Sequence, residues 1–413
     1  MQTSSLNRAG WRSTIRSTVT GSAFVLIVAA CQAGVASDRG TSGTGLEITA
    51  GPSLATSPSQ VASFGASWER ITIQPALDAP LTSVAWTGTQ FLAVDRVFGT
   101  VIASSDGRTW QRQPRIEDGV LGQVVAGPQG VLGVGGRYGD SEGVVAIWRS
   151  LDGITWTSAP DDASLHGGGF LTMATIVDTD GGWLAVGGES LSCIPRACRL
   201  VRAVTWTSPD GLAWTRGVDS AAMLHAEMWG VVHTPSDYLA VGDAAADPSQ
   251  TDSAIRPAVW TSSDGRSWTR SAELPLVPAA EDADVILDSV ATVGARVVAV
   301  GHVSTQTSAA ARAFAWLRDG DTWSLTEIGQ FIPSQGIRLV AVPGGLLAMF
   351  GPGTGTSCSS SIWSSDDGSS WSCIGNDPVF ADSTVSDAAV SPDAEVLVGS
   401  GPDGAVVWTS ARH

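Results

Sequence analysis

Four side chains of the sequence are of types that could bind a metal ion or transfer protons. His166 and His225 stand at equivalent places in two neighbouring copies of a repeat, and Glu227 and His302 are predicted to lie near them. Imidazole and carboxylate groups in such a cluster would serve as metal ligands or as a general acid and base. Solvated or internally bonded loop histidines are the alternative, and no metal-ligand spacing accompanies the four residues. We therefore expect no metal, no other cofactor and no catalytic residues.

A second set of polar residues is predicted to contact a ligand, without any specific geometry. Most of them fall in or beside the long connections of the repeat, and binding residues tend to gather on such loops over a rigid scaffold. The set comprises Arg137, Tyr138, Glu189, Arg196, Asp243 and Arg338. We therefore expect the ligand on the face that carries the long connections.

The charge balance excludes one class of partner. The 413 residues include 40 acidic and 23 basic side chains, every basic one is arginine, and the formal net charge is −17. Nucleic-acid affinity comes largely from basic side chains that displace counterions from phosphates. We therefore expect no DNA or RNA partner. The 48 glycines and 17 tryptophans indicate many turns and short strands.

Residues 1–31 are predicted to be a lipoprotein signal peptide. Three arginines precede an apolar stretch at 21–30, which is too short to span a bilayer. The following segment, Val28-Ala29-Ala30-Cys31, resembles the bacterial lipobox, in which the cysteine is acylated. An ordinary cleavage site with an incidental cysteine is the alternative. Acylation of Cys31 would anchor the exported body outside the cytoplasmic membrane, or in the periplasm or at the outer membrane of a two-membrane cell.

Residues 32–66 are predicted to be a flexible tether. Their Gly/Ser/Thr/Ala/Pro mixture cannot bury enough apolar surface to offset its ordering entropy. The signal segment holds three of the 23 arginines and no acidic residue, so the mature chain would carry a net charge of −20.

Four cysteines remain once Cys31 is assigned to lipid, an even number in an oxidising compartment. Three pairings are formally open. We favour Cys193 with Cys198, which closes a small loop, and Cys358 with Cys373, which would cross one hairpin. A metal site is the competing interpretation, but no CxxC pair and no nearby histidine supports it.

A short phrase recurs along the body. Its copy at 259–270 reads Val-Trp-Thr-Ser-Ser-Asp-Gly-Arg-Ser-Trp-Thr-Arg, and related copies occur at 147–158, 205–216, 315–325 and 362–373. An Asp-Gly step between apolar runs is typical of a type I′ hairpin, whose two central residues both need positive φ. A second predicted hairpin precedes each phrase. Four short antiparallel strands repeated roughly every 40 to 60 residues are typical of propeller blades.

We predict an all-β, seven-bladed β-propeller of four-stranded antiparallel blades over residues 67–413. Six blades are complete, and the last lacks an outer strand that Ser67-Trp68-Glu69-Arg70 supplies from the other end of the chain. This closure would leave no exposed strand edge. Thirteen of the 17 tryptophans fall at two repeat positions and are expected to fill the gaps between blades. Trp86, Trp183 and Trp229 remain as candidate sugar-stacking platforms, although core packing is the commoner role.

The repeat resembles the Asp-box, or BNR, repeat of the sialidase-like propellers, whose pattern is Ser-x-Asp-x-Gly-x-Thr-Trp. Residues 364–371 carry it nearly in full, whereas in blades one to four the aspartate lies one residue later, directly before glycine. In the family this box is a structural turn remote from the central site, so the resemblance implies the fold. A sialidase of this family would need an arginine triad, a Tyr/Glu pair and an Asp acid. At the predicted inner-strand starts only Arg338 is an arginine, and Tyr138 is the only loop tyrosine.

These features together predict a monomeric, lipid-anchored propeller that binds a protein or carbohydrate ligand on its long-loop face and catalyses no reaction. A sialidase-like glycoside hydrolase with an unrecognised carboxylate pair is one alternative. An extracytoplasmic assembly or scaffold factor is another. The fold alone does not choose among the three.

Overall fold

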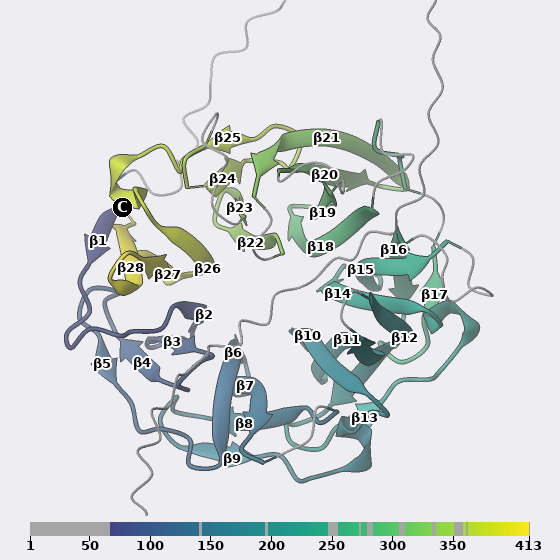
Figure 1. The fold of residues 1–413 in the computed structure, drawn as a ribbon, viewed down its shortest axis with the longest axis horizontal. Coiled ribbons are helices and arrows are strands. Elements are labelled where there is room, and N and C mark those ends of the chain that lie inside the picture. Colours follow the sequence, from purple (N-terminus) through teal and green to yellow (C-terminus); the bar gives the residue numbers. More distant parts are fainter. Residues whose placement is uncertain are drawn as a thin grey trace, which may run out of the picture.

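Seven antiparallel sheets of four strands each form a ring around a central axis in the computed structural model (Figure 1). The model describes residues 67–139, 143–194, 197–246, 255–271, 274–278, 284–304, 310–332, 336–350, 358–360 and 362–412. The predicted signal peptide, Cys31 and the predicted tether lie outside these residues. No helix in the described ranges is long and apolar enough to cross a membrane.

The blades follow one another along the chain. Blade one comprises β2 (Leu81–Trp86), β3 (Phe91–Asp95), β4 (Val101–Ser104) and β5 (Gln111–Arg112). Blade two comprises β6 (Gly119–Gly127), β7 (Gly130–Arg137), β8 (Ala146–Ser150) and β9 (Trp156–Ser158). Blade three comprises β10 (Phe170–Thr179), β11 (Gly182–Ile194), β12 (Ala197–Ser208) and β13 (Thr215–Arg216). Blade four comprises β14 (Ala226–His233), β15 (Tyr238–Ala245), β16 (Ile255–Ser262) and β17 (Thr269–Arg270).

The remaining blades complete the ring. Blade five comprises β18 (Asp284–Val293), β19 (Arg296–Ser304), β20 (Ala311–Asp319) and β21 (Thr322–Phe331). Blade six comprises β22 (Arg338–Val342), β23 (Gly345–Met349), β24 (Ile362–Ser365) and β25 (Ser372–Cys373). Blade seven comprises β26 (Thr384–Val390), β27 (Ala394–Gly401), β28 (Gly404–Ala411) and β1 (Glu69–Ile71). Three single-turn 3-10 helices, Ala163–Leu165, Ala221–Met223 and Pro378–Phe380, precede β10, β14 and β26.

The ring closes as predicted, because one strand from near the start of the described chain completes the last blade. β1 pairs antiparallel with β28, and Glu69 lies opposite Thr409. Trp68 packs on Phe380 with ring centroids 6.0 Å apart, and Glu69 forms an ion pair with Arg108 of blade one. β1 therefore covers the edge of β28 and also ties blade seven to its neighbour.

The core of the molecule is divided among the blade interfaces. Buried apolar side chains of the described residues form seven clusters, and each cluster joins two neighbouring blades. The third-strand tryptophans of five blades are almost fully buried in these clusters, as predicted. They are Trp148, Trp206, Trp260, Trp316 and Trp408. Each indole Nε1–H donates a hydrogen bond to the segment that connects its blade to the preceding one.

The predicted type I′ turns at the Asp-Gly steps are wrong. Gly265 has a φ of 68°, but Asp264 is not among the described residues with positive φ. The turn is longer, since the strand ends at Ser262 and resumes at Thr269. Side chains replace the missing ladder bonds: Ser262 Oγ accepts from the N–H of Gly265, and Asp264 Oδ1 accepts from Arg266 and Ser267. The box thus forms its turn mainly through side-chain acceptors.

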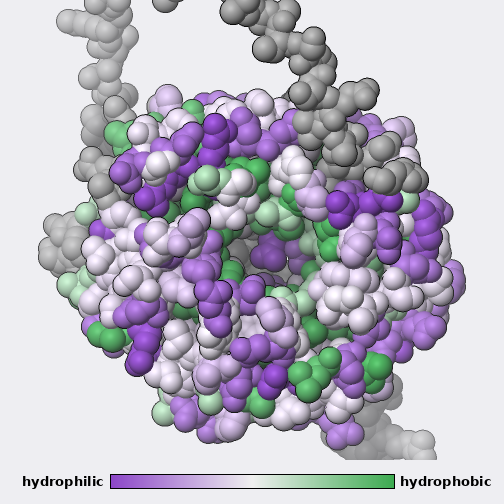
Figure 2. Space-filling view, turned by 180° about the vertical axis from the view of Figure 1, so that it is seen from behind, coloured by the Kyte–Doolittle hydropathy of each residue, from purple (hydrophilic) through white to green (hydrophobic). Residues whose placement is uncertain are grey.

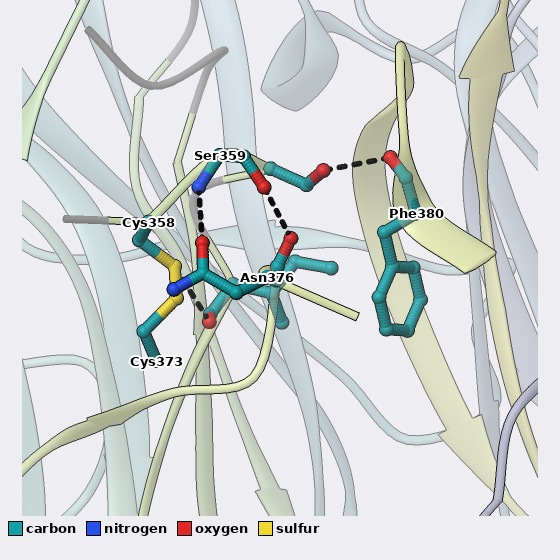
Figure 3. Close-up of a disulfide and its surroundings, with 8 residues drawn as sticks. Cys358, Ser359, Cys373, Asn376 and Phe380 are labelled. Atoms are coloured by element: carbon teal, nitrogen blue, oxygen red, sulfur yellow. Dashed lines mark hydrogen bonds between the residues drawn. A yellow bond between two sulfur atoms is a disulfide. The ribbon is translucent and has the colours of Figure 1, made fainter. Parts of the chain in front are cut away.

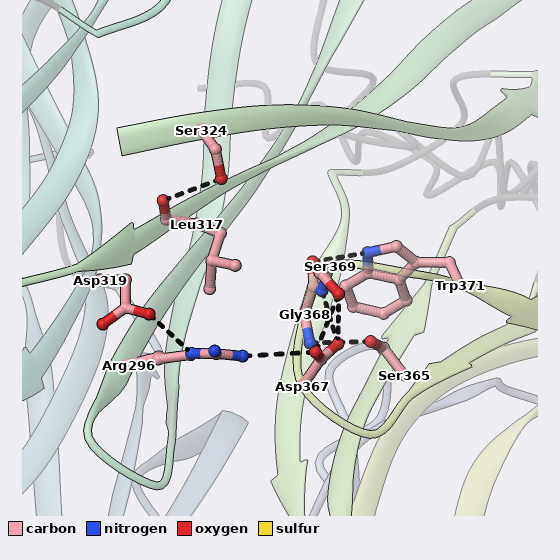
Figure 4. Close-up of polar contacts among 9 residues, drawn as sticks. All are labelled: Arg296, Leu317, Asp319, Ser324, Ser365, Asp367, Gly368, Ser369 and Trp371. Atoms are coloured by element: carbon pink, nitrogen blue, oxygen red, sulfur yellow. Dashed lines mark hydrogen bonds and ion pairs between the residues drawn. The ribbon is translucent and has the colours of Figure 1, made fainter. Parts of the chain in front are cut away.

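Blade six uses the same frame as blades one to four, which corrects the alignment made from the sequence. Asp367, and not Asp366, accepts from the N–H of Ser369, and Ser365 Oγ accepts from Gly368 (Figure 4). Arg296 of blade five reaches Asp367 at 3.3 Å and Asp319 at 3.2 Å. The box of blade six is therefore tied to blade five by this arginine.

The predicted disulfide between Cys358 and Cys373 is present, and it is drawn in Figure 3. It joins the segment before β24 to the short outer strand β25, and the backbone N–H of Ser359 donates to Asn376 Oδ1 beside it. The bridge thus secures the outer edge of blade six. The second predicted pair, Cys193 with Cys198, falls on side chains outside the described part of the chain.

Candidate functional site

The two faces of the ring differ in the length of their connections. On one face lie the short turns between first and second strands, together with the Asp-box turns. On the other face, called here the long-loop face, lie the connections from second to third strands and from blade to blade. Inner strands begin and second strands end at this face, so residues at those positions surround the same mouth of the channel.

The channel wall is shaped by a bulge that repeats in six inner strands. The register shifts by one residue at the same place in β2, β6, β10, β14, β18 and β26. The inserted residues are Thr82, Gly122, Ala174, Trp229, Asp288 and Ser386, all partly exposed. Bulges of this kind redirect one side chain out of the regular alternation. Figure 2 shows a hollow at the centre of the ring with hydrophilic side chains visible inside it.

The residue after the bulge bonds to the next blade. Ser83 Oγ donates to Asp387 Oδ2 of blade seven at 3.0 Å, and it accepts from the N–H of Val124 of blade two. Thr175 Oγ1 donates to the carbonyl of Trp229, and Ser289 Oγ accepts from the N–H of Leu339. The inner strands are therefore fixed to one another by polar contacts as well as by the apolar core.

A cluster of buried titratable groups lies where blades three, four and five meet. Asp243 Oδ2 accepts from the indole of Trp229 at 2.9 Å, and its Oδ1 accepts from the N–H of Leu287 in blade five at 3.1 Å. Asp288 Oδ2 contacts His302 Nδ1 at 2.7 Å. Glu227 lies opposite Asp243 in the β14–β15 ladder. We call Glu227, Asp243, Asp288 and His302 the mouth cluster.

Burial dominates the electrostatics of the mouth cluster. It raises the pKa of Glu227 to about 7, and the hydroxyl of Thr172, which donates to Oε1 at 2.8 Å, offsets only part of the rise. Burial also raises the pKa of Asp243 well above its usual value, and the nearby carboxylates Asp288 and Glu227 add to the increase. For His302, burial lowers the pKa, but the Asp288 carboxylate outweighs it and the net pKa is raised.

The structure brings three of the predicted residues, Glu227, Asp243 and His302, into this cluster. It adds Asp288, which the sequence analysis missed although a charged residue interrupts the apolar run of 285–293. His166 lies apart, paired with Asp161 in the connection before blade three. His225 has a φ of 50°, and its carbonyl accepts from the N–H of Ala245. In the described ranges no three His, Cys, Asp or Glu side chains are placed to hold a metal ion.

Glu189 belongs to a separate ion cluster in blade three. Its buried carboxylate lies 3.3 Å from Arg216 Nη2 and 3.6 Å from Arg202 Nε. Arg202 also pairs with Asp219, and Arg216 donates to the carbonyl of His166. The carboxylate is therefore neutralised inside the protein. The sequence analysis named Glu189 and His166 but neither arginine.

The remaining predicted residues are dispersed. Arg338 of blade six donates to the buried Asp387 of blade seven at 3.1 Å. Arg137 binds Ser158 and the carbonyl of Ala159 within blade two, and Tyr138 beside it is 64% exposed. Arg196 lies outside the described residues. Of the three candidate sugar platforms, Trp183 is buried, whereas Trp86 and Trp229 are both partly exposed. Trp86 packs on Phe91, and Trp229 donates to Asp243 in the mouth cluster.

A rigid loop on the long-loop face presents two apolar side chains to solvent. The fully buried Asp95 accepts from the N–H groups of Val97, Phe98 and Thr100 at 3.0, 2.6 and 3.1 Å. Gly99 closes the turn with a φ of 64°. Val97 and Phe98 are nevertheless 58% and 49% exposed. Sequence analysis missed this loop; an aspartate four residues before a glycine was the available signal.

Two cavities of the described structure lie on the Asp-box face instead. One, of about 170 Å³, is bounded by Asp106, Arg108, Asp393 and Thr409, between blades one and seven. The other, of about 450 Å³, is an open depression beside Pro128, Leu151 and Pro209. Neither includes a residue of the mouth cluster.

Comparisons with known proteins support the fold. No family model and no curated protein sequence matches the chain. A solved structure of YCF48 bound to a D1 peptide is similar over 84% of this chain and 96% of its own, with 15% identity and a TM-score of 0.50. An α-L-arabinofuranosidase, Arb93A from Fusarium graminearum, shows 13% identity over 68% of this chain and 89% of its own, at a TM-score of 0.41. A streptogramin B lyase covers 84% of this chain and 98% of its own, at 7% identity and a TM-score of 0.46. At such identities the likeness concerns the fold alone, and the fold is a seven-bladed propeller.

Proposed function

We propose that this chain is an exported lipoprotein, anchored through Cys31, whose propeller binds a segment of a partner protein on the long-loop face and catalyses no reaction. The observation that carries the proposal is the loop of Val97 and Phe98. The buried carboxylate of Asp95 accepts three backbone hydrogen bonds that fix this loop, and the loop exposes the large apolar side chains of Val97 and Phe98 to water. Rigid, exposed apolar groups of this kind are typical of protein-binding surfaces.

Tyr138 extends this surface onto the next blade. The would-be Cβ of Gly99 approaches Val120 at the start of β6, and the N–H of Tyr138 donates to the carbonyl of Asp118 just before β6. Both loops therefore lie beside the same strand end. We call Val97, Phe98 and Tyr138 the rim patch. Aromatic residues on ordered backbone lose little entropy on binding, which favours them as anchors.

The likeness to YCF48, whose solved structure holds a D1 peptide, is consistent with a protein ligand on this fold. It also favours the assembly or scaffold role among the functions considered for the chain. The internal pairing of the carboxylates argues the same way, because Glu189 and Asp387 are each engaged by arginine rather than directed at a substrate.

The point at which the chain enters the propeller suits this role. β1 begins beside the Asp-box turn of blade one, where Glu69 meets Arg108. A tether attached there would join the propeller on its Asp-box face and would leave the long-loop face unobstructed. The rim patch would then be accessible to a partner.

Substitution on the two faces tests the proposal. Val97→Ser with Phe98→Ser should reduce co-purification of the partner from solubilised host membranes at least tenfold, about 1.4 kcal/mol of binding free energy. Leu151→Ser with Ile154→Ser, which removes two exposed apolar groups from the Asp-box face, should leave it unchanged. Equal effects of the two pairs would contradict the proposal. Separately, Cys31→Ser should release the protein into the medium, and retention in the membrane would contradict the anchor.

Glycoside hydrolysis is the second candidate, and one observation favours it. Glu227 has a pKa of about 7 and lies opposite a second carboxyl, Asp243, as a general acid of a glycosidase would. The purified chain would then release sugar from a panel of arabinan, xylan and sialyl-lactose, and Glu227→Gln would abolish the release. The first proposal predicts no release from any of these.

A further inference from the structure

We infer that the mouth cluster acts as a pH-dependent latch between blades three, four and five, whose contacts with one another we call the seam. The cluster holds the seam together while its side chains are protonated, and deprotonation of these side chains loosens it. The inference deepens the proposed function by adding regulation to the long-loop face. Only the effect of the latch on ligand binding rests on the proposed function. The latch itself is a property of the folded chain and requires no ligand.

The cluster spans the seam by direct contacts. Glu227 on β14 is bonded to Thr172 of blade three, and a Cβ on Gly188 of blade three would lie 2.6 Å from its side chain. Asp243 on β15 accepts from the backbone of β18 in blade five. One carboxyl thus touches blade three, and the other holds the first strand of blade five.

His302 is the cationic group that contacts the cluster directly, through Asp288, and several charged groups on the surrounding strands have partners of their own. From blade three, Glu189 is engaged by Arg202 and Arg216. In blade four, the charge of Arg256 acts on Asp284 of β18. In blade six, Gly336 lies against Asp288, since a Cβ there would approach Oδ1 to 2.9 Å, and Arg338 bonds Asp387. Behind the imidazole, the ring of Phe331 packs edge-on at 5.6 Å.

The net charge of the mouth cluster depends on the protonation of Glu227 and His302. With Glu227 and Asp243 protonated, the Asp288 carboxylate and the His302 imidazolium cancel, and the cluster is neutral. Loss of the protons from Glu227 and His302 leaves two buried negative charges, on Glu227 and Asp288. Unpaired buried charges are strongly unfavourable, and water entry is the available response. Because Glu227 titrates near pH 7, this change falls in a physiological range.

The consequence appears at the face proposed to bind a ligand. β14 and β18 both begin at the long-loop face, and Asp243 holds the indole of Trp229 beside the channel. A hydrated seam would release Trp229 and loosen the loops that precede both strands. Contacts that a partner makes with Trp229 or with these loops would then weaken as pH rises through neutrality.

Hydrogen–deuterium exchange of the full chain tests the latch. After correction for intrinsic exchange, amides of Ala226–His233 and Asp284–Val293 should exchange about tenfold faster at about pH 8.5 than at about pH 5.5. Amides of β2 and β26 should show no such change. The double variant Glu227→Gln with Asp243→Asn should lose most of the pH effect. Glu327→Gln, an exposed carboxylate of blade five paired with Arg312, is the matched control and should keep it.

Three outcomes would overturn the inference: no pH effect at the seam, an equal effect in β2 and β26, or an undiminished effect in the double variant. If the double variant does not fold, Glu227→Gln alone gives the same readout, because its amide oxygen still accepts from Thr172. Exchange is measured without any partner, so failure of the proposed function leaves this result standing. A seam without pH response would likewise leave the face-substitution test unaffected.

Discussion

At the scale of single residues, the aspartates that precede glycine in the Asp-box turns have a defined structural task. In blade four, Asp264 accepts hydrogen bonds from the backbone N–H groups of Ser267 and Arg266, and these bonds lower its pKa to about 2. The Ser267 bond has the larger effect, and partial burial of the carboxylate offsets part of the decrease. Asp152 has a pKa of about 2 for the same reason. These carboxylates are therefore ionised at all but very acidic pH, and their stabilising effect is lost only as pH falls from about 4 towards 2.

Removal of one such acceptor should cost a measurable part of the stability. Asp264→Ala leaves two backbone N–H groups without their acceptor, and we expect a loss of about 1 kcal/mol in the free energy of unfolding at neutral pH. Urea denaturation measures it. Asp180→Ala, at an exposed aspartate outside the boxes, is the control and should change the free energy by less than about 0.5 kcal/mol. Equal losses for the two variants would contradict the assigned role.

The residues of the mouth cluster show what sequence reasoning could reach. The sequence predicts Glu227 and His302 near His166 and His225, and it predicts Asp243 as a ligand contact beside a long connection; the structure groups these three with Asp288 instead. Asp288 was missed because it occupies a bulge, and a bulge breaks the period of two on which strand reading depends. Arg338 pairs with Asp387 of the next blade, 49 residues away, a contact that residue spacing does not predict.

At the scale of elements, the sequence repeat predicts the blades and their order correctly. The turns at the Asp-Gly steps, in contrast, are not the predicted type I′ turns. The Asp-Gly steps of blades one to four resemble two-residue hairpin turns, yet the box uses serine and aspartate side chains to close a longer turn. Blade five, which lacks the serine and is one residue shorter, does form the tight hairpin, with Asp319 opposite Thr322. The serine and aspartate acceptors of the box therefore determine whether a blade forms the longer box turn or a tight hairpin.

The disulfide belongs to this scale as well, because it fastens one short strand. Cys358 and Cys373 are 15 residues apart, and closing a loop of that length is worth about 3 kcal/mol. The double variant Cys358→Ser with Cys373→Ser should lose about that much stability in urea denaturation. The wild type treated with reductant should lose a similar amount. An unchanged midpoint in both would show that the bridge contributes little to blade six.

At the scale of the whole molecule, the pH dependence of stability should follow the raised pKa values. The pKa of Glu227 rises from 4.5 to about 7 on folding, so its contribution is fully present below 4.5 and is lost as pH rises to about 7. His302, whose folded pKa is also raised, adds a loss above about pH 6.5. We expect the free energy of unfolding to fall by up to about 3 kcal/mol between about pH 4.5 and 7.5.

Urea denaturation across this range measures the effect, and Glu227→Gln should flatten the lower part of the curve. Stability that rises steadily from about pH 5 to 8 would contradict the assignment, since that slope requires the unfolded chain to bind more protons than the folded one in this range, as it would if histidines with lowered pKa values dominated.

The whole ring also decides which side faces a partner, and site-specific photo-crosslinking in intact host cells tests this most directly. A benzophenone amino acid replaces Phe98 on the long-loop face in one variant and Leu151 on the Asp-box face in another. We expect a discrete protein adduct from position 98 that disappears when Tyr138→Ala is added, and no such adduct from position 151. No adduct from position 98, or the same adduct from both faces, would contradict the claim that this propeller binds a protein on its long-loop face.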